Sequence, residues 1–236
     1  MTNARDIAKI IDHSLLHPTL TDEELIKGCE LAKKYKVVSV CIKPYAVKLA
    51  AEILEGSGVL VGTVINFPHG NSRIDIKVLE AEQACKDGAV ELDMVVNIGK
   101  VLSKDWNYVE REIKAIKEVT RKYDAILKVI FENDYLNDDR LKIKLCEICS
   151  SLQVDFVKTS TGYGFVKGSD GNYSYKGATD HDLALMRENS SAEVQVKASG
   201  GLKTLDDVLR VKKLGVTRIG TTATETIIEE AKKRSS

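Results

Sequence analysis

The sequence predicts an α/β protein, a (β/α)8 TIM barrel with an extra N-terminal helix. Two observations support this prediction: strand-like and helical segments alternate from end to end, and eight such pairs fit within 236 residues. Several of the strand-like segments are nearly all apolar, as expected for strands that are buried on both faces. An open doubly wound sheet is the alternative. Because no linker or low-complexity tract interrupts the alternation, we expect one domain over residues 1–236.

The expected elements follow from hydrophobic period and from start signals. Strands are expected at residues 11–15, 37–42, 60–66, 90–95, 125–131, 154–158, 194–198 and 218–220. Helices are expected at residues 3–10, 22–35, 44–55, 74–87, 106–122, 138–150, 180–188, 205–214 and 222–232. Thr21 begins a capping box, Thr204 precedes two aspartates, and Pro44 fits a first helical turn. Residues 165–177 are turn-rich, and we expect a long loop there that acts as a lid.

Composition excludes several classes of partner. Lys and Arg together number 35, as do Asp and Glu, so no charge excess indicates nucleic acid or a membrane surface. No apolar run approaches the roughly 18 residues of a membrane span, and the first residues lack the apolar core of a signal peptide. Five cysteines without a disulfide-framework spacing indicate reduced thiols and a cytoplasmic protein.

Two expected strands end in a lysine followed by small residues and glycine. Lys158 ends the strand at 154–158, and Lys197 lies near the end of the strand at 194–198. A lysine in a buried strand is costly unless it is paired or has a chemical role. Two lysines at the same end of consecutive strands suggest that one ammonium lowers the pKa of the other.

Alternation along the strands assigns further charged side chains to the barrel interior. In residues 90–95 the apolar side chains share one face, and Glu91 and Asp93 share the other. The charged set expected inside is Lys128, Lys158, Lys197, Glu91, Asp93 and Glu132. A purely structural barrel is filled by Val, Ile and Leu. The alternative is a structural ion-pair network, although such networks are often no more stable than apolar packing.

An activated lysine indicates imine chemistry. A free lysine has a pKa of about 10.4, so fewer than about one amine in a thousand is neutral and nucleophilic at neutral pH. A neighbouring ammonium and partial desolvation lower that pKa, and the usual purpose is a Schiff base with a carbonyl substrate. Asp93 and the second lysine are candidates for the proton transfers that an imine requires.

Glycines follow three of the expected strands at the same rim as the lysines. They are Gly162 and Gly164, Gly200 and Gly201, and Gly220, which precedes the last helix. In this fold the loops after the last strands and a helix N-terminus commonly bind phosphate. Tight turns without a ligand are the alternative at any one loop.

These residues lie in motifs that resemble the deoxyribose-phosphate aldolases, which are class I aldolases on a (β/α)8 barrel. In order along the chain the motifs are IDHSLL (11–16), VC (40–41), FPHG (67–70), ELDMVVNIG (91–99), LKVI (127–130), FVKTSTG (156–162), VKASGG (196–201) and RIGT (218–221). Each motif is weak alone, but together they span almost the whole chain in order.

The resemblance implies reversible cleavage of 2-deoxy-D-ribose 5-phosphate to D-glyceraldehyde 3-phosphate and acetaldehyde in deoxyribonucleotide catabolism, without a metal or other cofactor. Lys158 would form the Schiff base, Lys197 would perturb its pKa, and Asp93 would be the acid/base. Residues matching the substrate-binding positions are Asp12, Cys41, Lys128, Gly162, Gly200, Gly201, Gly220 and Thr222. The expected partners are small phosphorylated sugars and aldehydes, together with further copies of the chain in a dimer or tetramer.

The chain departs from the family pattern at Asn66, where glycine is usual, at Asp134 and at Ala223, and its loop 165–177 is longer. These departures bear on substrate affinity and not on the lysine chemistry. A sister Schiff-base aldolase for another phosphorylated sugar, or a non-catalytic phosphosugar-binding barrel, are the alternative functions. Cys146 and Cys149 are expected to be core residues and not a redox or zinc pair.

Overall fold

The computed structural model describes residues 3–235, and eight parallel strands in them close into a barrel. Around the barrel the order is β1-β10-β9-β6-β5-β4-β3-β2. The strands are β1 (Ile11–Leu15), β2 (Ser39–Ile42), β3 (Leu60–Ile65), β4 (Glu91–Val95), β5 (Ile126–Ile130), β6 (Phe156–Lys158), β9 (Gln195–Ser199) and β10 (Val216–Thr221). The predicted (β/α)8 barrel is confirmed, and the open-sheet alternative is wrong.

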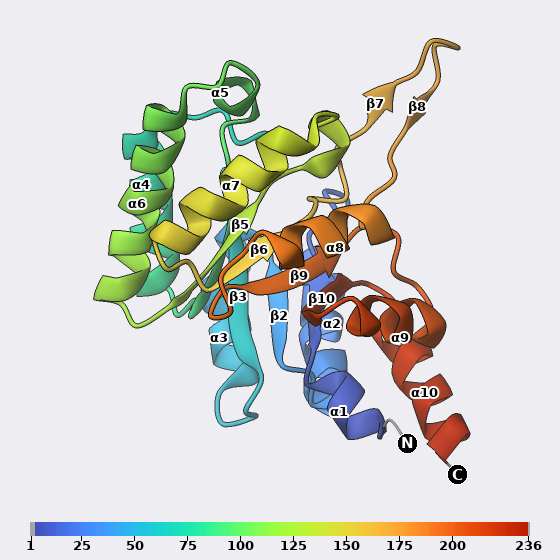
Figure 1. Cartoon of the computed structure of the whole chain (residues 1–236). Coiled ribbons are helices and arrows are strands. Elements are labelled where there is room, and N and C mark those ends of the chain that lie inside the picture. Colours follow the sequence, from blue (N-terminus) through green and yellow to red (C-terminus); the bar gives the residue numbers. More distant parts are fainter. Residues whose placement is uncertain (1–2, 236) are drawn as a thin grey trace.

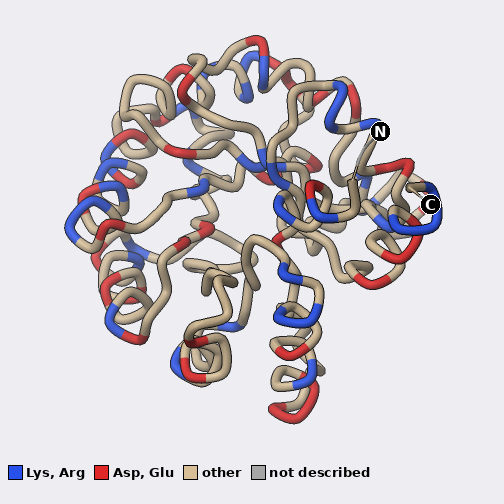
Figure 2. Tube along the Cα trace, turned by 90° about the horizontal axis from the view of Figure 1, so that it is seen from below, with Lys and Arg blue, Asp and Glu red and all other residues tan. Residues whose placement is uncertain are grey.

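Helices form an outer ring around the strands (Figure 1). They are α1 (Ala4–Ala8), α2 (Asp22–Tyr35), α3 (Val47–Leu54), α4 (Ile74–Lys86), α5 (Ile98–Leu102), α6 (Trp106–Lys122), α7 (Asp139–Ser151), α8 (Asp180–Glu188), α9 (Leu205–Lys213) and α10 (Thr224–Ser235), with short 3-10 turns η1 (Pro44–Ala46) and η2 (Asn133–Tyr135). Positively and negatively charged residues alternate along the chain in this ring (Figure 2), in keeping with the balanced charge. None of these helices in residues 3–235 is long and apolar enough to cross a membrane.

The residues predicted to begin helices form N-terminal caps at α2 and α9, whereas two other helices begin later than predicted. The Thr21 hydroxyl accepts a hydrogen bond from the Glu24 amide, and the Glu24 carboxylate accepts one from the Thr21 amide. Thr204 and Asp207 form the same reciprocal pair at α9. Pro44 begins a 3-10 turn instead of the helix itself, so α3 starts three residues later than predicted. The last helix begins at Thr224 and not at Thr222, which leaves Thr222 in the loop after β10.

The segment at 165–177 is not a plain loop. It contains a two-stranded antiparallel hairpin of β7 (Val166–Lys167) and β8 (Tyr173–Ser174). The hairpin projects from the barrel on the side opposite the two termini (Figure 1). Strand-like alternation over two-residue strands is too short to be read from sequence.

Candidate active site

The register of the barrel brings the predicted lysines together. Lys158 on β6 is the direct partner of Lys197 on β9, and Lys197 is the partner of Arg218 on β10. Asp93 on β4 is the partner of Lys128 on β5. Residues opposite each other across a ladder point to the same face of the sheet, so all five side chains enter the barrel interior.

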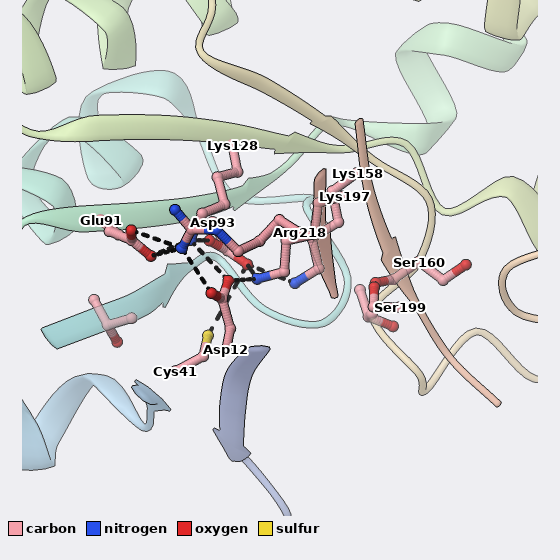
Figure 3. A network of polar contacts seen from close by, with 12 residues as sticks. Asp12, Cys41, Glu91, Asp93, Lys128, Lys158, Ser160, Lys197, Ser199 and Arg218 are labelled. Atoms are coloured by element: carbon pink, nitrogen blue, oxygen red, sulfur yellow. Dashed lines mark hydrogen bonds and ion pairs between the residues drawn. The ribbon is translucent and has the colours of Figure 1, made fainter. Parts of the chain in front are cut away.

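Asp93 is the hub of these contacts (Figure 3). Its Oδ2 atom accepts hydrogen bonds from Lys158 Nζ and Lys197 Nζ, each at 2.7 Å. Its Oδ1 atom lies 3.0 Å from Lys128 Nζ. The thiol Sγ of Cys41 lies 4.0 Å from Oδ2. One carboxylate therefore contacts all three lysines that the sequence assigned to the interior.

A second carboxylate, Asp12 on β1, contacts two of these lysines and a residue of the neighbouring strand β2. Its Oδ2 accepts from Lys197 Nζ and, at 3.1 Å, from Lys128 Nζ. Its Oδ1 accepts from Ser39 Oγ at 2.8 Å. Asp12 thus contacts two of the lysines that Asp93 contacts, and every side chain in the set is buried.

The electrostatic state of the carboxylates is set by these neighbours. Burial alone would raise the pKa of Asp93, but the ammonium groups of Lys128, Lys158 and Lys197 outweigh it and hold that pKa well below its usual range. The pKa of Asp12 is likewise lowered, because Lys128 and Lys197 outweigh burial. Both carboxylates are therefore ionised at neutral pH.

The three lysines do not respond alike. Burial lowers the pKa of Lys158, the Lys197 ammonium adds to the effect, and Asp93 opposes both without reversing them. For Lys197 and Lys128 burial also acts downward, but two and three carboxylates respectively outweigh it and raise the pKa of each amine. Lys158 is thus the one of the three that is biased toward the neutral, nucleophilic amine.

A cavity of about 510 Å³ opens above the network. Nine of the eleven residues predicted for the site line it: Asp12, Cys41, Lys158, Gly162, Lys197, Gly200, Gly201, Gly220 and Thr222. Asp93 and Lys128 do not line it, because they are buried beneath the two lysines that do. A carbonyl compound in the cavity would meet Lys158 and Lys197 before Asp93.

Backbone conformation explains two of the glycines. Gly162 has φ +87° and Gly201 has φ +83°, backbone angles that residues other than glycine rarely adopt. Both lie at the cavity with no described atom within 4 Å of where a Cβ would stand. Together with Gly200 and the loop that precedes α10, they form a rim of the cavity where the small residues let a ligand approach the backbone closely.

Three other charged or reactive residues lie outside the network of lysines and aspartates. The prediction that Glu132 points from its strand into the barrel is wrong, because this residue follows the end of β5 and has φ +59°. Its carboxylate accepts hydrogen bonds from the amide and hydroxyl of Thr161. Cys146 and Cys149 are buried in α7, as predicted, and burial raises the pKa of both thiols.

Two of the sequence departures have clear structural roles. Asn66 has φ +52°, a conformation in which Asn is among the best-tolerated residues after glycine. Its Oδ1 atom also accepts from the Ser72 amide at 2.8 Å. Asp134 accepts from the Lys176 and Gly177 amides at 2.5 and 3.0 Å, so it anchors the base of the long hairpin.

Several site residues were missed from sequence. Arg218 is buried in the interior, but the strand was predicted to begin at this residue, so alternation could not assign its face. Phe165 and Tyr175, at the two ends of the hairpin, line the cavity with their rings 5.1 Å apart. No periodic signal in the sequence links a loop residue to a cavity wall.

Comparison with known proteins places the chain in a family. The sequence profile described as DeoC/LacD family aldolase matches residues 7–221. The chain is 51% identical to the deoxyribose-phosphate aldolase of Rhodopirellula baltica, covering 97% of this chain and 90% of that one. It is 45% identical to the enzyme of that name from Caldanaerobacter subterraneus, covering 97% and 95%.

Solved structures agree. A tetrameric deoxyribose phosphate aldolase from Aeropyrum pernix superposes with a TM-score of 0.87 at 28% identity, covering 99% of this chain and 94% of that one. A further solved aldolase superposes with a TM-score of 0.88 at 34% identity, covering 100% and 98%. The chain therefore belongs to the DeoC/LacD family of aldolases.

Proposed function

We propose that this protein is a deoxyribose-phosphate aldolase that reversibly cleaves 2-deoxy-D-ribose 5-phosphate to D-glyceraldehyde 3-phosphate and acetaldehyde. The observation that carries the proposal is that Lys158 is buried at the floor of the cavity and that burial and Lys197 lower its pKa. The relatives of the same name, similar over nearly the whole chain, support the choice of substrate. The reaction would serve deoxyribonucleotide catabolism.

The first half of the reaction forms an imine. The neutral amine of Lys158 attacks the C1 aldehyde of the open-chain sugar, and the carbinolamine loses water to give a protonated imine. Removal of the proton from the C3 hydroxyl breaks the C2–C3 bond and releases D-glyceraldehyde 3-phosphate. The imine accepts the electron pair and becomes the enamine of acetaldehyde.

The second half returns the enzyme to its starting state. The enamine gains a proton at C2, water adds to the resulting imine, and acetaldehyde leaves as the amine of Lys158 is restored. Water is released once and consumed once, so the steps balance. Lys197, with its raised pKa, supports these transfers as a proton donor beside Lys158.

Asp93 is proposed as the acid/base. Its carboxylate lies beneath Lys158 and Lys197 and outside the cavity lining, so it exchanges protons with substrate through Lys197 or through an ordered water. Asp12 and Cys41 line the pocket, and Lys128 holds the Asp93 carboxylate in place from outside the cavity lining. Gly162, Gly200, Gly201, Gly220 and Thr222 are proposed to hold the phosphate next to the start of α10.

A substrate panel tests the proposal. The retro-aldol rate is measured with 2-deoxyribose 5-phosphate, with ribose 5-phosphate and with unphosphorylated deoxyribose, for the unsubstituted protein and for Lys158→Met. We expect the first substrate to have the highest kcat/KM and the variant to be inactive. A preference for another phosphorylated sugar would favour a sister aldolase, and activity that persists in Lys158→Met would overturn the proposal.

Assembly and location follow as further parts of the proposal. A homo-oligomer, as a dimer or a tetramer, is supported by the relative from Aeropyrum pernix, which is described as tetrameric. A cytoplasmic location is supported by the free cysteines, four of which are buried.

A further inference from the structure

Arg218 is a buried arginine that the proposed steps do not use. Its Nη1 atom lies 2.7 Å from Asp12 Oδ1 and 2.9 Å from Glu91 Oε1. Its guanidinium stands 5.2 Å from the ring centre of Phe156. Lys128 Nζ completes the other side of Glu91 at 2.5 Å. Arg218 and Glu91 therefore form an ion pair that is connected to the network of Asp12 and Asp93 through Asp12 and Lys128 (Figure 3).

The charged side chains that face this interior come from six strands, and a seventh strand supplies a titratable thiol. They are Asp12 on β1, Glu91 and Asp93 on β4, Lys128 on β5, Lys158 on β6, Lys197 on β9 and Arg218 on β10, and β2 adds the titratable thiol of Cys41. In this set there are four cationic side chains and three carboxylates. With every group in this set charged, the cluster has one cation in excess, and buried charge without a counter-charge is strongly disfavoured. Glu132, just after β5, is also buried and interacts electrostatically with Lys158, but burial raises its pKa, and its carboxylate bonds to Thr161 and forms no ion pair with these four cations.

The contacts decide which cation is released from that excess. Lys128 contacts three carboxylates, Lys197 contacts two, and Arg218 contacts two. Lys158 contacts only Asp93, whose Oδ2 atom it shares with Lys197. Arginine does not lose its proton in proteins. Lys158 is therefore the group whose neutralisation balances the cluster at least cost, and it is also the lysine proposed to form the Schiff base.

We propose that Arg218 is a positioning residue for catalysis: its fixed charge, held by Asp12 and Glu91, creates the cation excess that Lys158 relieves by giving up a proton. Glu91 acts in the opposite sense. This inference rests on the proposed function and names a residue pair that acts on Lys158 through its neighbours. A purely structural role for the pair would affect stability and leave the ionisation of Lys158 unchanged.

Four variants separate these roles. Arg218→Met removes the excess cation, and Glu91→Gln removes a carboxylate. The double variant Arg218→Met/Glu91→Gln loses one of each and restores an excess of one. Arg218→Lys keeps the charge but loses the forked geometry. The readout is the initial rate at which acetaldehyde and borohydride label Lys158, mapped by peptide analysis from pH 5 to pH 10, on protein whose fold is checked by circular dichroism.

We expect the pH midpoint for Lys158 labelling to rise by about one unit in Arg218→Met, a tenfold loss of rate below the midpoint. Glu91→Gln is expected to shift the midpoint downward, the double variant to return it to within about threefold in rate, and Arg218→Lys to keep it close to the original. If Arg218→Met does not fold, Glu91→Gln still tests the claim, because its shift has the opposite sign.

An unchanged midpoint in Glu91→Gln or in folded Arg218→Met would overturn the inference, and so would shifts of the same sign in both. Either result would leave the aldolase proposal intact as long as Lys158 is labelled. Absence of label at Lys158 in the unsubstituted protein would instead count against the proposed function, so the two failures are distinguishable.

Discussion

Lys158 and Lys197 share one acceptor atom: the Nζ atoms of both lie 2.7 Å from Oδ2 of Asp93. The two residues are also direct partners in the ladder between β6 and β9. Two ammonium groups so close together cannot both be equally stable, and the better-paired one keeps its proton. Burial lowers the pKa of Lys158 and the Lys197 ammonium adds to this effect, whereas Lys197 has a second carboxylate partner, Asp12, and keeps its proton.

Replacement of Lys197 by leucine should make Lys158 more basic. The substitution removes the neighbouring ammonium that helps to lower the pKa of Lys158, so the neutral amine appears at higher pH. We expect the acidic limb of the kcat/KM profile to move to higher pH and turnover at neutral pH to fall by about 10²-fold or more. Lys48→Leu, on the exposed side of α3, serves as the control and should leave the profile in place. A profile that does not move in Lys197→Leu would refute this coupling.

Replacement of Asp93 by asparagine should shift the same limb in the other direction. The carboxylate raises the pKa of Lys158 against burial, so its removal should lower that pKa further and make the neutral amine available at lower pH. Turnover should nevertheless fall by about 10²- to 10⁴-fold, because the proposed acid/base is lost. The measurement is the pH dependence of Lys158 labelling beside that of kcat. Turnover near that of the unsubstituted protein would exclude Asp93 from proton transfer.

The hairpin offers a prediction on substrate binding. Asp134 holds its base through the Lys176 and Gly177 amides, and a hydrogen bond to a charged group contributes about 1.5–3 kcal/mol. Asp134→Ala should free Phe165 and Tyr175 from their places at the cavity wall. We expect KM to rise by about threefold to tenfold with kcat nearly constant, the pattern for an interaction equally present in ground and transition states.

Asp170→Ala is the matched control for the hairpin. Asp170 lies at the hairpin tip, where its carboxylate accepts from Asn172, and it does not line the cavity. Its removal should not change KM. Equal values of KM for the Asp134 and Asp170 variants would show that the hairpin has no part in substrate binding.

A buried ion pair outside the site predicts a large effect on stability. Lys77 on α4 and Glu112 on α6 are both 0% exposed and lie 2.7 Å apart, and Lys77 Nζ also donates to the carbonyls of Gly70 and Val95. Lys77→Met leaves the Glu112 carboxylate buried without its cation, which should cost about 3–5 kcal/mol of unfolding free energy in urea. Lys27→Met breaks the exposed pair with Glu23 and should cost no more than about 0.5 kcal/mol. Similar losses in the two variants would contradict this account.

Much of the fold could be predicted because local signals agree with it. The boundaries of β1, α2, α6 and α8 match the prediction, since clear caps or sharp changes of period mark their ends. Helix α5 and the turn η2 were missed, because five and three residues carry too little periodicity to distinguish them from a loop.

The site was predictable where chemistry and strand alternation coincide. A charged residue in the middle of a strand, such as Asp93 or Lys128, can be assigned to the interior from its neighbours. The prediction for Glu132 failed because β5 ends before that residue and the chain turns there with a positive φ. The walls formed by Phe165 and Tyr175 depend on how a hairpin folds back, which no local pattern encodes.

The most direct test of the central claim is to reduce the protein with borohydride in the presence of acetaldehyde and to map the modified peptides. The account predicts a dominant ethyl adduct on Lys158, because burial and Lys197 make this amine the reactive one. Label spread over surface lysines with Lys158 unmodified would contradict it, and a non-catalytic phosphosugar-binding barrel would then be the better description.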